Sequence, residues 1–299
     1  MELIEGTIIA IHGGLIRVRT GETIQLVSSR RRLNWEGGAP EVSRLVVGDV
    51  VSLEMTGSDG VVVAVRSRKT SLLRRAASSR RPQVLAANID QALLVFAARY
   101  PEPKQGLLDR FLVACHHAGI EPVITINKID QGTDAVESWL PTYENLGYAV
   151  QRVSAQTAWG LGGIKRLLPN RTTLFCGPSG SGKSSLLNRV YPGFRLAVGS
   201  LSDGSGKGRH TTTRAELMPL PFGGFVIDTP GLREFGLWDL DSQSLQAAFP
   251  EIEANRNACR FPNCSHVHEP DCAVRTAVQE RAISSARYHS YCTLLEETS

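Results

Sequence analysis

The sequence lacks any apolar run long enough to cross a membrane, and its first residues, MELIEGTIIA, contain no basic leader of the secretory type. We therefore expect a cytoplasmic protein without a membrane partner. Cysteine is scarce, with six in 299 residues, and in a cytoplasmic chain clustered cysteines favour metal binding over disulfides. A heptad repeat is also missing, so nothing favours a coiled-coil dimer and we expect a monomer.

Net charge is small, at +4, but it is unevenly distributed. Residues 1–81 carry 13 Lys and Arg against 8 Asp and Glu, whereas residues 251–299 carry 5 against 7. Such an excess suits a polyanionic partner, although on charge alone an ordinary solvated face is an equally good explanation. The basic clusters lie at residues 30–32, 66–69, 74–75 and 80–81.

The most informative stretch is 171–190, RTTLFCGPSGSGKSSLLNRV. Arg171–Cys176 is β-branched and aromatic, which predicts a strand, and an apolar-periodic helix opens at Lys183. The residues between them fit the phosphate-loop pattern, in which glycines let backbone N–H groups face an anion at a helix N-terminus. We expect Lys183 to reach the β and γ phosphates and the Ser184 hydroxyl to ligate Mg²⁺. The predicted nucleotide-binding residues here are Gly177, Pro178, Ser179, Gly180, Ser181, Gly182, Lys183, Ser184 and Ser185.

Residues 1–69 alternate short β runs with glycine-containing turns and show no helical periodicity, which predicts a small barrel of the OB-fold type. Such barrels commonly bind nucleic acid, in agreement with the arginine clusters; a barrel that only caps its neighbour is the alternative. The predicted strands are Ile4–Ile11, Gly14–Arg19, Thr23–Val27, Val50–Met55 and Val61–Val65.

Residues 70–82, rich in Arg and Ser, are interpreted as a linker, and an α/β pattern occupies 83–236. Strands are predicted at Ile89–Ala97, Pro122–Ile126, Tyr148–Val153, Arg171–Cys176, Ala215–Leu220 and Gly224–Ile227. Helices are predicted at Gly106–Ala118, Ala135–Leu146 and Leu161–Leu168.

Two short motifs in this α/β region suit recognition of guanine. Asn127-Lys128-Ile-Asp130 follows the second strand, at the edge where doubly wound sheets bind ligands. A carboxylate at Asp130 can accept hydrogen bonds from the ring N–H and the exocyclic amino group of guanine, a pair that adenine lacks. Asn127 and the Lys128 stem would complete the pocket. Ser154-Ala155 follows the next strand and can add backbone contacts to the guanine oxygen.

Residues 198–214 form a basic, glycine-rich stretch in which one of Thr211, Thr212 and Thr213 can supply a hydroxyl to Mg²⁺. Asp228-Thr-Pro-Gly231 follows the last strand, so Asp228 can hold Mg²⁺ through water and the Gly231 N–H can sense the γ phosphate. Leu232 stands where Ras-type enzymes have the glutamine that orients the attacking water. The nearest ionisable group that could replace this glutamine is His210.

The last sixty residues contain a set of metal ligands. Cys259, Cys264, His266 and Cys272 supply three thiolates and one imidazole, a complete tetrahedral set for one structural Zn²⁺ with no position left open for catalysis. His268 is the alternative nitrogen ligand, although spacing from Cys264 favours His266. Ser284–Leu295 is predicted to be a helix whose tyrosines pack against this zinc module.

The motifs run in an unusual order, with Asn-Lys-x-Asp and Ser-Ala before the phosphate loop, the threonine loop and Asp-x-x-Gly. This is a circular permutation of the usual GTPase order. A permuted GTPase between a small barrel and a Cys/His module resembles the RsgA (YjeQ) family of small-ribosomal-subunit-dependent GTPases over nearly the whole chain. The specific matches are GPSGSGKS at 177–184, GRHTTT at 208–213, DTPGLREFGLW from 228, and CRFPNCSH with EPDCAV around the metal ligands.

The resemblance implies three domains: an RNA-binding OB-fold at 1–69, a circularly permuted GTPase domain at 83–236, and a small α-helical zinc-binding domain at 237–299. It further implies a late factor in small-subunit maturation that binds the subunit and its rRNA, near the decoding region of the subunit. Such a factor hydrolyses GTP to GDP slowly alone and much faster on the subunit, and leaves after hydrolysis. His210 matches the proposed catalytic residue of that family, and Thr212 matches its Mg²⁺-side residue.

Two alternatives to a ribosome-activated GTPase stay open at this point. One is an RNA-bound assembly checkpoint in which nucleotide only controls affinity. The other is an ATP-dependent phosphotransferase, which Asn127-Lys-Ile-Asp130 and the lack of a recognisable acceptor site oppose.

Overall fold

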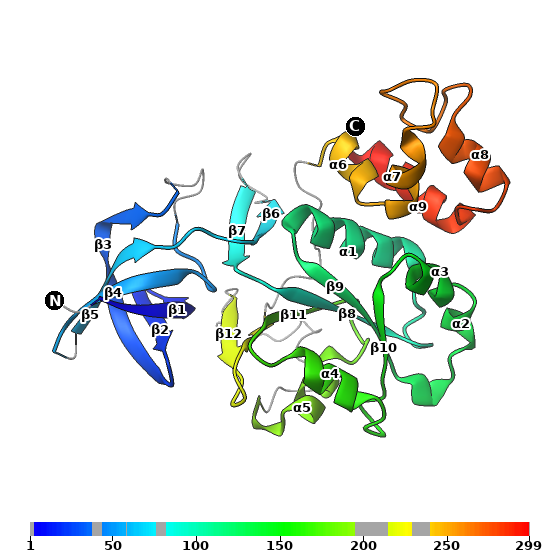
Figure 1. The fold of residues 1–299 in the computed structure, drawn as a ribbon. Helices are drawn as coiled ribbons and strands as arrows, with labels where there is room; N and C mark the ends of the chain where they lie inside the picture. The colour runs from blue at the N-terminus through cyan, green and yellow to red at the C-terminus, as the bar shows by residue number, and fades with distance from the viewer. Residues whose placement is uncertain are drawn as a thin grey trace, which may run out of the picture.

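The computed structural model describes residues 3–37, 44–57, 59–75, 82–194, 215–228 and 240–298. Its three parts follow one another along the chain: a β-barrel, a central sheet with helices on both faces, and a helical C-terminal module, residues 240–298 (Figure 1). This arrangement confirms the fold class predicted from the sequence.

Five strands close the barrel in the order β1-β2-β3-β5-β4, with β4 pairing back onto β1. Most strands pair antiparallel, but β3 and β5 run parallel, as in an OB-type Greek-key barrel. Alternate residues point inward, so that Ile8, Val18, Leu53 and Val62 are fully buried. The strands are β1 (Leu3–His12), β2 (Leu15–Thr20), β3 (Thr23–Trp35), β4 (Val50–Thr56) and β5 (Asp59–Val65).

The arginine cluster at 30–32 lies in an irregularity of β3. Ser29 pairs with Val62 and Asn34 pairs with Ala64, so four residues of β3 face a single residue of β5. This bulge leaves Arg30, Arg31 and Arg32 exposed. Arg30 contacts Glu54.

The segment interpreted as a linker is partly a strand. β6 (Ser71–Arg75) pairs antiparallel with β7 (Pro82–Ala87) as a two-stranded sheet between the barrel and the central sheet. A bridge from Val47 to Ala86 and the packing of Val46 against Val84 connect this hairpin to the segment before β4. The Arg- and Ser-rich composition of 70–82 did not predict this strand, because most of its pairing partner, β7, lies after the segment.

The central sheet has the order β10-β9-β8-β11-β13-β12, parallel throughout except for β12. β8 lies inside the sheet and all seven of its residues are buried, as expected for a strand covered on both faces. Its strands are β8 (Gln91–Ala97), β9 (Glu121–Asn127), β10 (Ala149–Arg152), β11 (Thr172–Cys176), β12 (Glu216–Pro219) and β13 (Phe225–Asp228).

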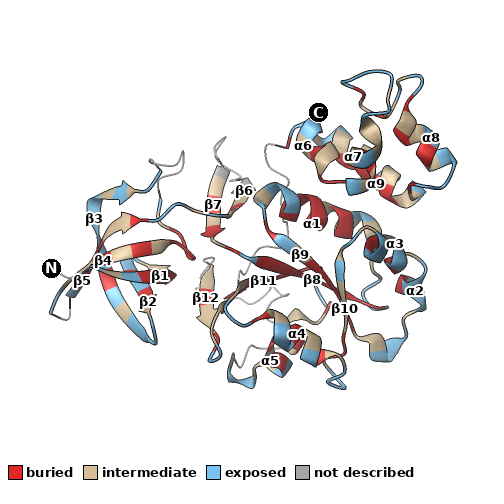
Figure 2. Ribbon diagram, in the orientation of Figure 1, coloured by how far each residue is buried: buried red, intermediate tan, exposed pale blue. Residues whose placement is uncertain are grey.

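Helices cover the two faces of this sheet as separate layers (Figure 2). One core contains Phe111, Leu140 and Tyr143 from α1 and α3, and the other contains Ile164 and Leu187 from α4 and α5. The helices are α1 (Gln105–Ala118), α2 (Asp134–Glu137), α3 (Leu140–Asn145), α4 (Leu161–Leu167) and α5 (Lys183–Val190), with 3₁₀ turns η1 (Ile129–Gln131) and η2 (Pro192–Phe194).

The single helix predicted at Ala135–Leu146 is two short helices, α2 and α3. Pro141 lies in the first turn of α3. Proline has no N–H to continue an α-helix and disfavours helical geometry in the residue before it, so the chain restarts there.

The C-terminal module packs α6 (Ser242–Ala247), α7 (Pro250–Arg256), α8 (Ala273–Gln279) and α9 (Ser285–Thr298) around its own core. Phe249, Ile252 and Tyr291 are fully buried there. Among the helices in the described part of the chain, none has the length and apolar character needed to span a membrane.

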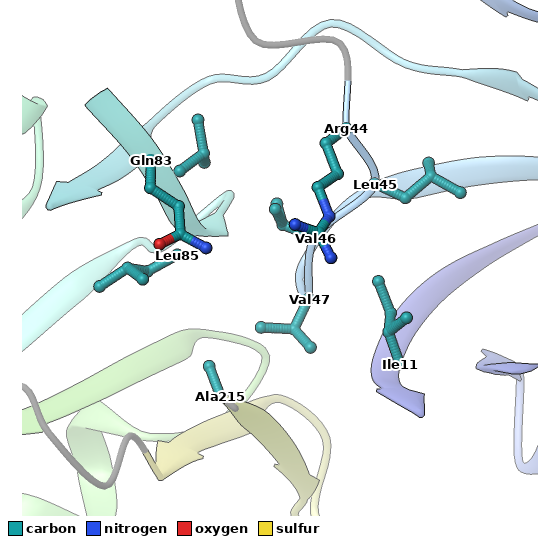
Figure 3. Close-up of a pocket in the computed structure, with 9 residues that line it drawn as sticks. Ile11, Arg44, Leu45, Val46, Val47, Gln83, Leu85 and Ala215 are labelled. Carbon is teal, nitrogen blue, oxygen red and sulfur yellow. The ribbon is translucent and has the colours of Figure 1, made fainter. Parts of the chain in front are cut away.

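The barrel contacts the central sheet at β12 and β13. His12 lies 3.0 Å from Glu216, and the Arg19 guanidinium lies 5.5 Å from the centre of the Phe225 ring. Beside these contacts is a pocket lined by β1, the segment before β4, β7 and Ala215 (Figure 3).

Candidate functional site

The predicted phosphate loop joins β11 to α5 and lies close to atoms of β8 and β9. Gly177 has φ +139°, and a Cβ there would lie 2.1 Å from the Val95 carbonyl oxygen. Gly182 has φ +90°, and its Cβ would lie 2.4 Å from Asn127 Nδ2. Glycine is therefore required at both positions by conformation and by space.

The partly buried Lys183 and the buried Ser181 have different surroundings. The Lys183 ammonium donates to the carbonyl oxygens of Gly177 and Pro178, at 2.8 Å each, which holds it over the loop where the phosphates are expected. The Ser181 hydroxyl is fully buried and has no hydrogen-bond partner among the described residues.

Asn127 connects the base-recognition motifs to the phosphate loop. Its side-chain amide donates to the Ser181 and Gly182 carbonyls at 3.0 and 3.4 Å, and its oxygen accepts from the Ala155 N–H at 3.1 Å. The residue is 1% exposed. One buried side chain thus links three motifs that lie far apart in the sequence.

Asp130 is exposed at the edge of the sheet, on the 3₁₀ turn η1. One of its carboxylate oxygens accepts a hydrogen bond from the Ser154 hydroxyl, which in turn accepts from the Thr157 N–H at 3.0 Å. This arrangement orients the carboxylate and leaves its other oxygen for a ligand. The structure therefore brings Asp130, Ser154, Ala155 and Asn127 together.

A further segment that was not predicted lies beside these motifs: residues 98–104, which follow β8. The Lys128 ammonium donates to the Tyr100 carbonyl at 2.8 Å. A Cβ on Gly180 would lie 3.5 Å from Pro101 Cδ, so this segment also borders the phosphate loop. Lys128 adopts the left-handed conformation, with φ +62°.

Of the side chains predicted to hold Mg²⁺, the described part of the structure contains that of Ser184. Ser184 is buried in the first turn of α5, as a phosphate-loop Mg²⁺ ligand requires. Asp228 ends β13, but its side chain lies outside the described part of the structure, as do the predicted His210, Thr211, Thr212, Thr213 and Gly231.

The predicted metal ligands Cys259, Cys264, His266 and Cys272 form one cluster, with all four donor atoms within 4.8 Å of one another. Cys259 Sγ lies 3.9 Å from Cys272 Sγ, and His266 Nδ1 lies 3.5 Å from each of these sulfurs. Tetrahedral zinc, with bonds of about 2.3 Å to sulfur and 2.0–2.1 Å to nitrogen, separates its donors by roughly 3.8 and 3.5 Å. The donor set therefore fits zinc, whereas His268 is exposed and outside the cluster.

Hydrogen bonds around the cluster hold its loop in place. The Tyr288 and Tyr291 hydroxyls on α9 donate to the carbonyls of His266 and Ser265, at 2.7 and 2.9 Å, which confirms the predicted packing of this helix. Burial would raise the pKa of Glu269, but N–H groups that include Ser265 donate to its carboxylate and lower the pKa to about 2. Burial also lowers the pKa of His266, which favours the neutral imidazole that binds metal.

Comparison with known proteins agrees with this arrangement. The model of the RsgA GTPase family matches residues 65–238, more than half of the chain. The chain belongs to the RsgA GTPase family. It is 39% identical to a curated relative from Gemmatimonas aurantiaca, named small ribosomal subunit biogenesis GTPase RsgA, over 98% of this chain and 96% of the relative. A relative of the same name from Caldanaerobacter subterraneus is 38% identical, over 99% and 96%.

Two solved structures are similar over almost the whole chain. YjeQ from Thermotoga maritima superposes with a TM-score of 0.80 at 29% identity, covering 99% of both chains. YloQ, described as a circularly permuted GTPase, gives a TM-score of 0.77 at 31% identity, covering 99% of this chain and 95% of that one. The resemblance stated from the motifs is confirmed: this chain is a GTPase of the RsgA family with the permuted order.

Proposed function

We propose that this protein is a GTPase activated by the small ribosomal subunit and that it acts late in the maturation of that subunit. It binds the subunit, hydrolyses GTP to GDP and phosphate, and then dissociates. The observation that supports the proposal is the Asn127 bridge, in which one buried side chain joins the Asn-Lys-x-Asp and Ser-Ala motifs to the phosphate loop in a member of the RsgA family. The names of the curated relatives support the ribosomal partner.

In this proposal the guanine base binds at the edge of the sheet beyond β9 and β10. The Asp130 carboxylate accepts hydrogen bonds from the ring N–H and amino group, and the Ser154 hydroxyl keeps that carboxylate in position. Ala155, held by Asn127, presents backbone to the guanine oxygen. Adenine cannot make the pair of hydrogen bonds to Asp130, which gives the site its preference.

The phosphates bind over residues 177–185, where backbone N–H groups and the N-terminus of α5 face them. Lys183 exchanges its two carbonyl acceptors for the β and γ phosphate oxygens. Mg²⁺ bound with GTP would be held by Ser184 and Thr212, and through water by Asp228; it would offset the charge that develops on the phosphates.

Activation of water is the incomplete part of the site. Leu232 has no group that could orient water where Ras-type enzymes use glutamine. We assign this role to His210 and the sensing of the γ phosphate to the Gly231 N–H. An incomplete intrinsic site accounts for slow turnover that the subunit accelerates.

The barrel is the proposed rRNA-binding part. Its bulge in β3 presents Arg31 and Arg32 to solvent, and exposed arginines are suited to phosphate contacts. The Cys₃His cluster would hold one structural Zn²⁺, which fixes the loop between α7 and α8. We further propose a cytoplasmic monomer.

Sedimentation with purified small subunits tests this cycle. We expect the protein to co-sediment with the subunit in the presence of a non-hydrolysable GTP analogue and to be released with GTP or GDP. Equal binding in all nucleotide states would contradict the proposal. Binding to large subunits at the same affinity would remove the ribosomal assignment.

A further inference from the structure

A largely buried ion cluster joins the C-terminal module to α1, which packs on the central sheet. Arg287 on α9 is 1% exposed, and its guanidinium donates to Asp109 on α1 at 2.6 Å and to both carboxylate oxygens of Glu251 on α7 at 2.7 and 3.0 Å. The same group lies 4.5 Å from the centre of the Phe249 ring. A buried charge is tolerated only when it is paired and hydrogen-bonded, as Arg287 is here.

The buried Asp109 carboxylate depends on its hydrogen bond from Arg287. It is fully buried in α1, and its Oδ1 accepts from Arg287 and, at 2.7 Å, from the Tyr143 hydroxyl of α3. Its other oxygen is buried without a hydrogen-bond partner in the described residues. Removing Arg287 would leave a buried carboxylate with one neutral donor, so α1 would have to shift or admit water.

The contact continues as apolar packing along the two helices. Val113 of α1 belongs to the core of the C-terminal module. At the rim of the same helix pair, Arg110 and Glu297 form a second ion pair, with side chains 31% and 45% exposed. Water screens this outer ion pair, so it stabilises the contact between α1 and α9 far less than the ion pairs of Arg287 do.

Helix α1 also leads directly to the nucleotide site. The segment 98–104 immediately precedes it, and the Ala98 N–H donates to the Asn127 carbonyl at 2.8 Å. In the same segment Tyr100 accepts from Lys128, and Pro101 borders Gly180 of the phosphate loop. A shift of α1 therefore moves the residues against which the guanine and phosphate motifs rest.

We propose that Arg287 is a positioning residue for the nucleotide site, acting through Asp109, α1 and segment 98–104 on Lys128 and the phosphate loop. The C-terminal module thereby holds the guanine side of the site in its binding geometry. Contacts that displace the module alter nucleotide affinity by this route. The inference rests on the proposed guanine-nucleotide site.

The test measures affinity for a fluorescent GDP, methylanthraniloyl-GDP, in the full-length zinc-loaded protein. Arg287→Met and the charge-conserving Arg287→Lys are compared with Arg110→Met, the control on the same helix pair. Arg287→Lys keeps the charge but loses the planar donor set, which retains a measurable variant if Arg287→Met does not fold. We expect the Arg287 variants to bind about two- to thirtyfold more weakly, and Arg110→Met to stay within about twofold of wild type.

A double-mutant cycle separates positioning from stability. In a Lys128→Met background, Arg287→Lys should weaken binding by a smaller factor than it does in the wild-type background, because one of the contacts through which it acts is already gone. Hydrogen exchange at 98–104 should rise in the Arg287 variants while zinc content stays stoichiometric.

Wild-type GDP affinity in the Arg287 variants, with faster exchange confined to 240–298, would overturn the inference and make the cluster a purely structural joint. Additive effects with Lys128→Met would overturn it as well. If the wild-type protein failed to prefer GDP over ADP, the proposed function itself would fail, which is a distinguishable result.

Discussion

Replacing Asn127 by aspartate tests the bridge at the centre of the site. The two side chains have the same shape, but aspartate loses the amide that donates to Ser181 and Gly182. At this 1% exposed position, a carboxylate oxygen would face two carbonyl oxygens. The Ala155 N–H would keep its acceptor.

The cost follows from the geometry. The donor bond at 3.0 Å is well formed, whereas the one at 3.4 Å is weak. Leaving a buried carbonyl unpartnered costs about 1–3 kcal/mol. The free protein can relieve this cost by moving the loop, whereas bound GDP requires the loop geometry that restores it, so GDP binding should weaken by about 5- to 150-fold. Burial beside carbonyl oxygens raises the pKa of the new carboxyl, and its protonated form can again donate. The defect should therefore shrink as pH falls.

Isothermal titration with GDP at pH 6 and pH 8 measures both effects. Asn145→Asp is the matched control, since Asn145 is exposed on α3 and introduces the same charge in the same part of the chain. An Asn127→Asp protein that bound GDP within about twofold of wild type at pH 8 would refute the reasoning.

Three further predictions concern the other groups of the site. Asp130→Asn exchanges the acceptor for guanine's N–H groups for an amide donor, so hydrolysis should shift from GTP toward xanthosine triphosphate, measured as the ratio of the two kcat/KM values. Cys272→Ser removes one of four metal ligands and should abolish stoichiometric zinc, measured by mass spectrometry of the metal, with loss of exchange protection at 240–298. His210→Ala should lower subunit-stimulated turnover by at least about a hundredfold with GTP affinity unchanged, measured in single-turnover assays.

Each of these has a clear contrary result. An Asp130→Asn protein with unchanged GTP preference would place guanine elsewhere. Full zinc content in Cys272→Ser would mean that the cluster is not the metal site. Unchanged turnover in His210→Ala would require a group from the subunit to orient the water.

Local patterns were sufficient to predict most of the elements that carry the motifs. The barrel strands alternate inward and outward residues, and β8 is a continuous buried run, so both are visible as periodicity. The phosphate loop was predictable because its glycines obey a local steric requirement, now seen at Gly177 and Gly182. The Cys/His cluster was predictable because coordination chemistry limits which residues can gather around a metal ion.

What could not be predicted depends on contacts between distant residues. Arg287 and Asp109 are 178 residues apart, and nothing near either one in the sequence marks it as paired. Segment 98–104 contacts Lys128 through a backbone carbonyl, which any residue at Tyr100 would supply. Strand β6 needed its partner β7 to be recognised, because its own composition resembles a linker.

The measurement that tests the account most directly is steady-state hydrolysis of GTP and ATP by the purified protein, with and without isolated small ribosomal subunits. The account predicts turnover selective for GTP that rises at least about tenfold with the subunit, equivalent to roughly 1.4 kcal/mol off the barrier. Turnover that does not respond to the subunit, or that is equal for ATP, would contradict it.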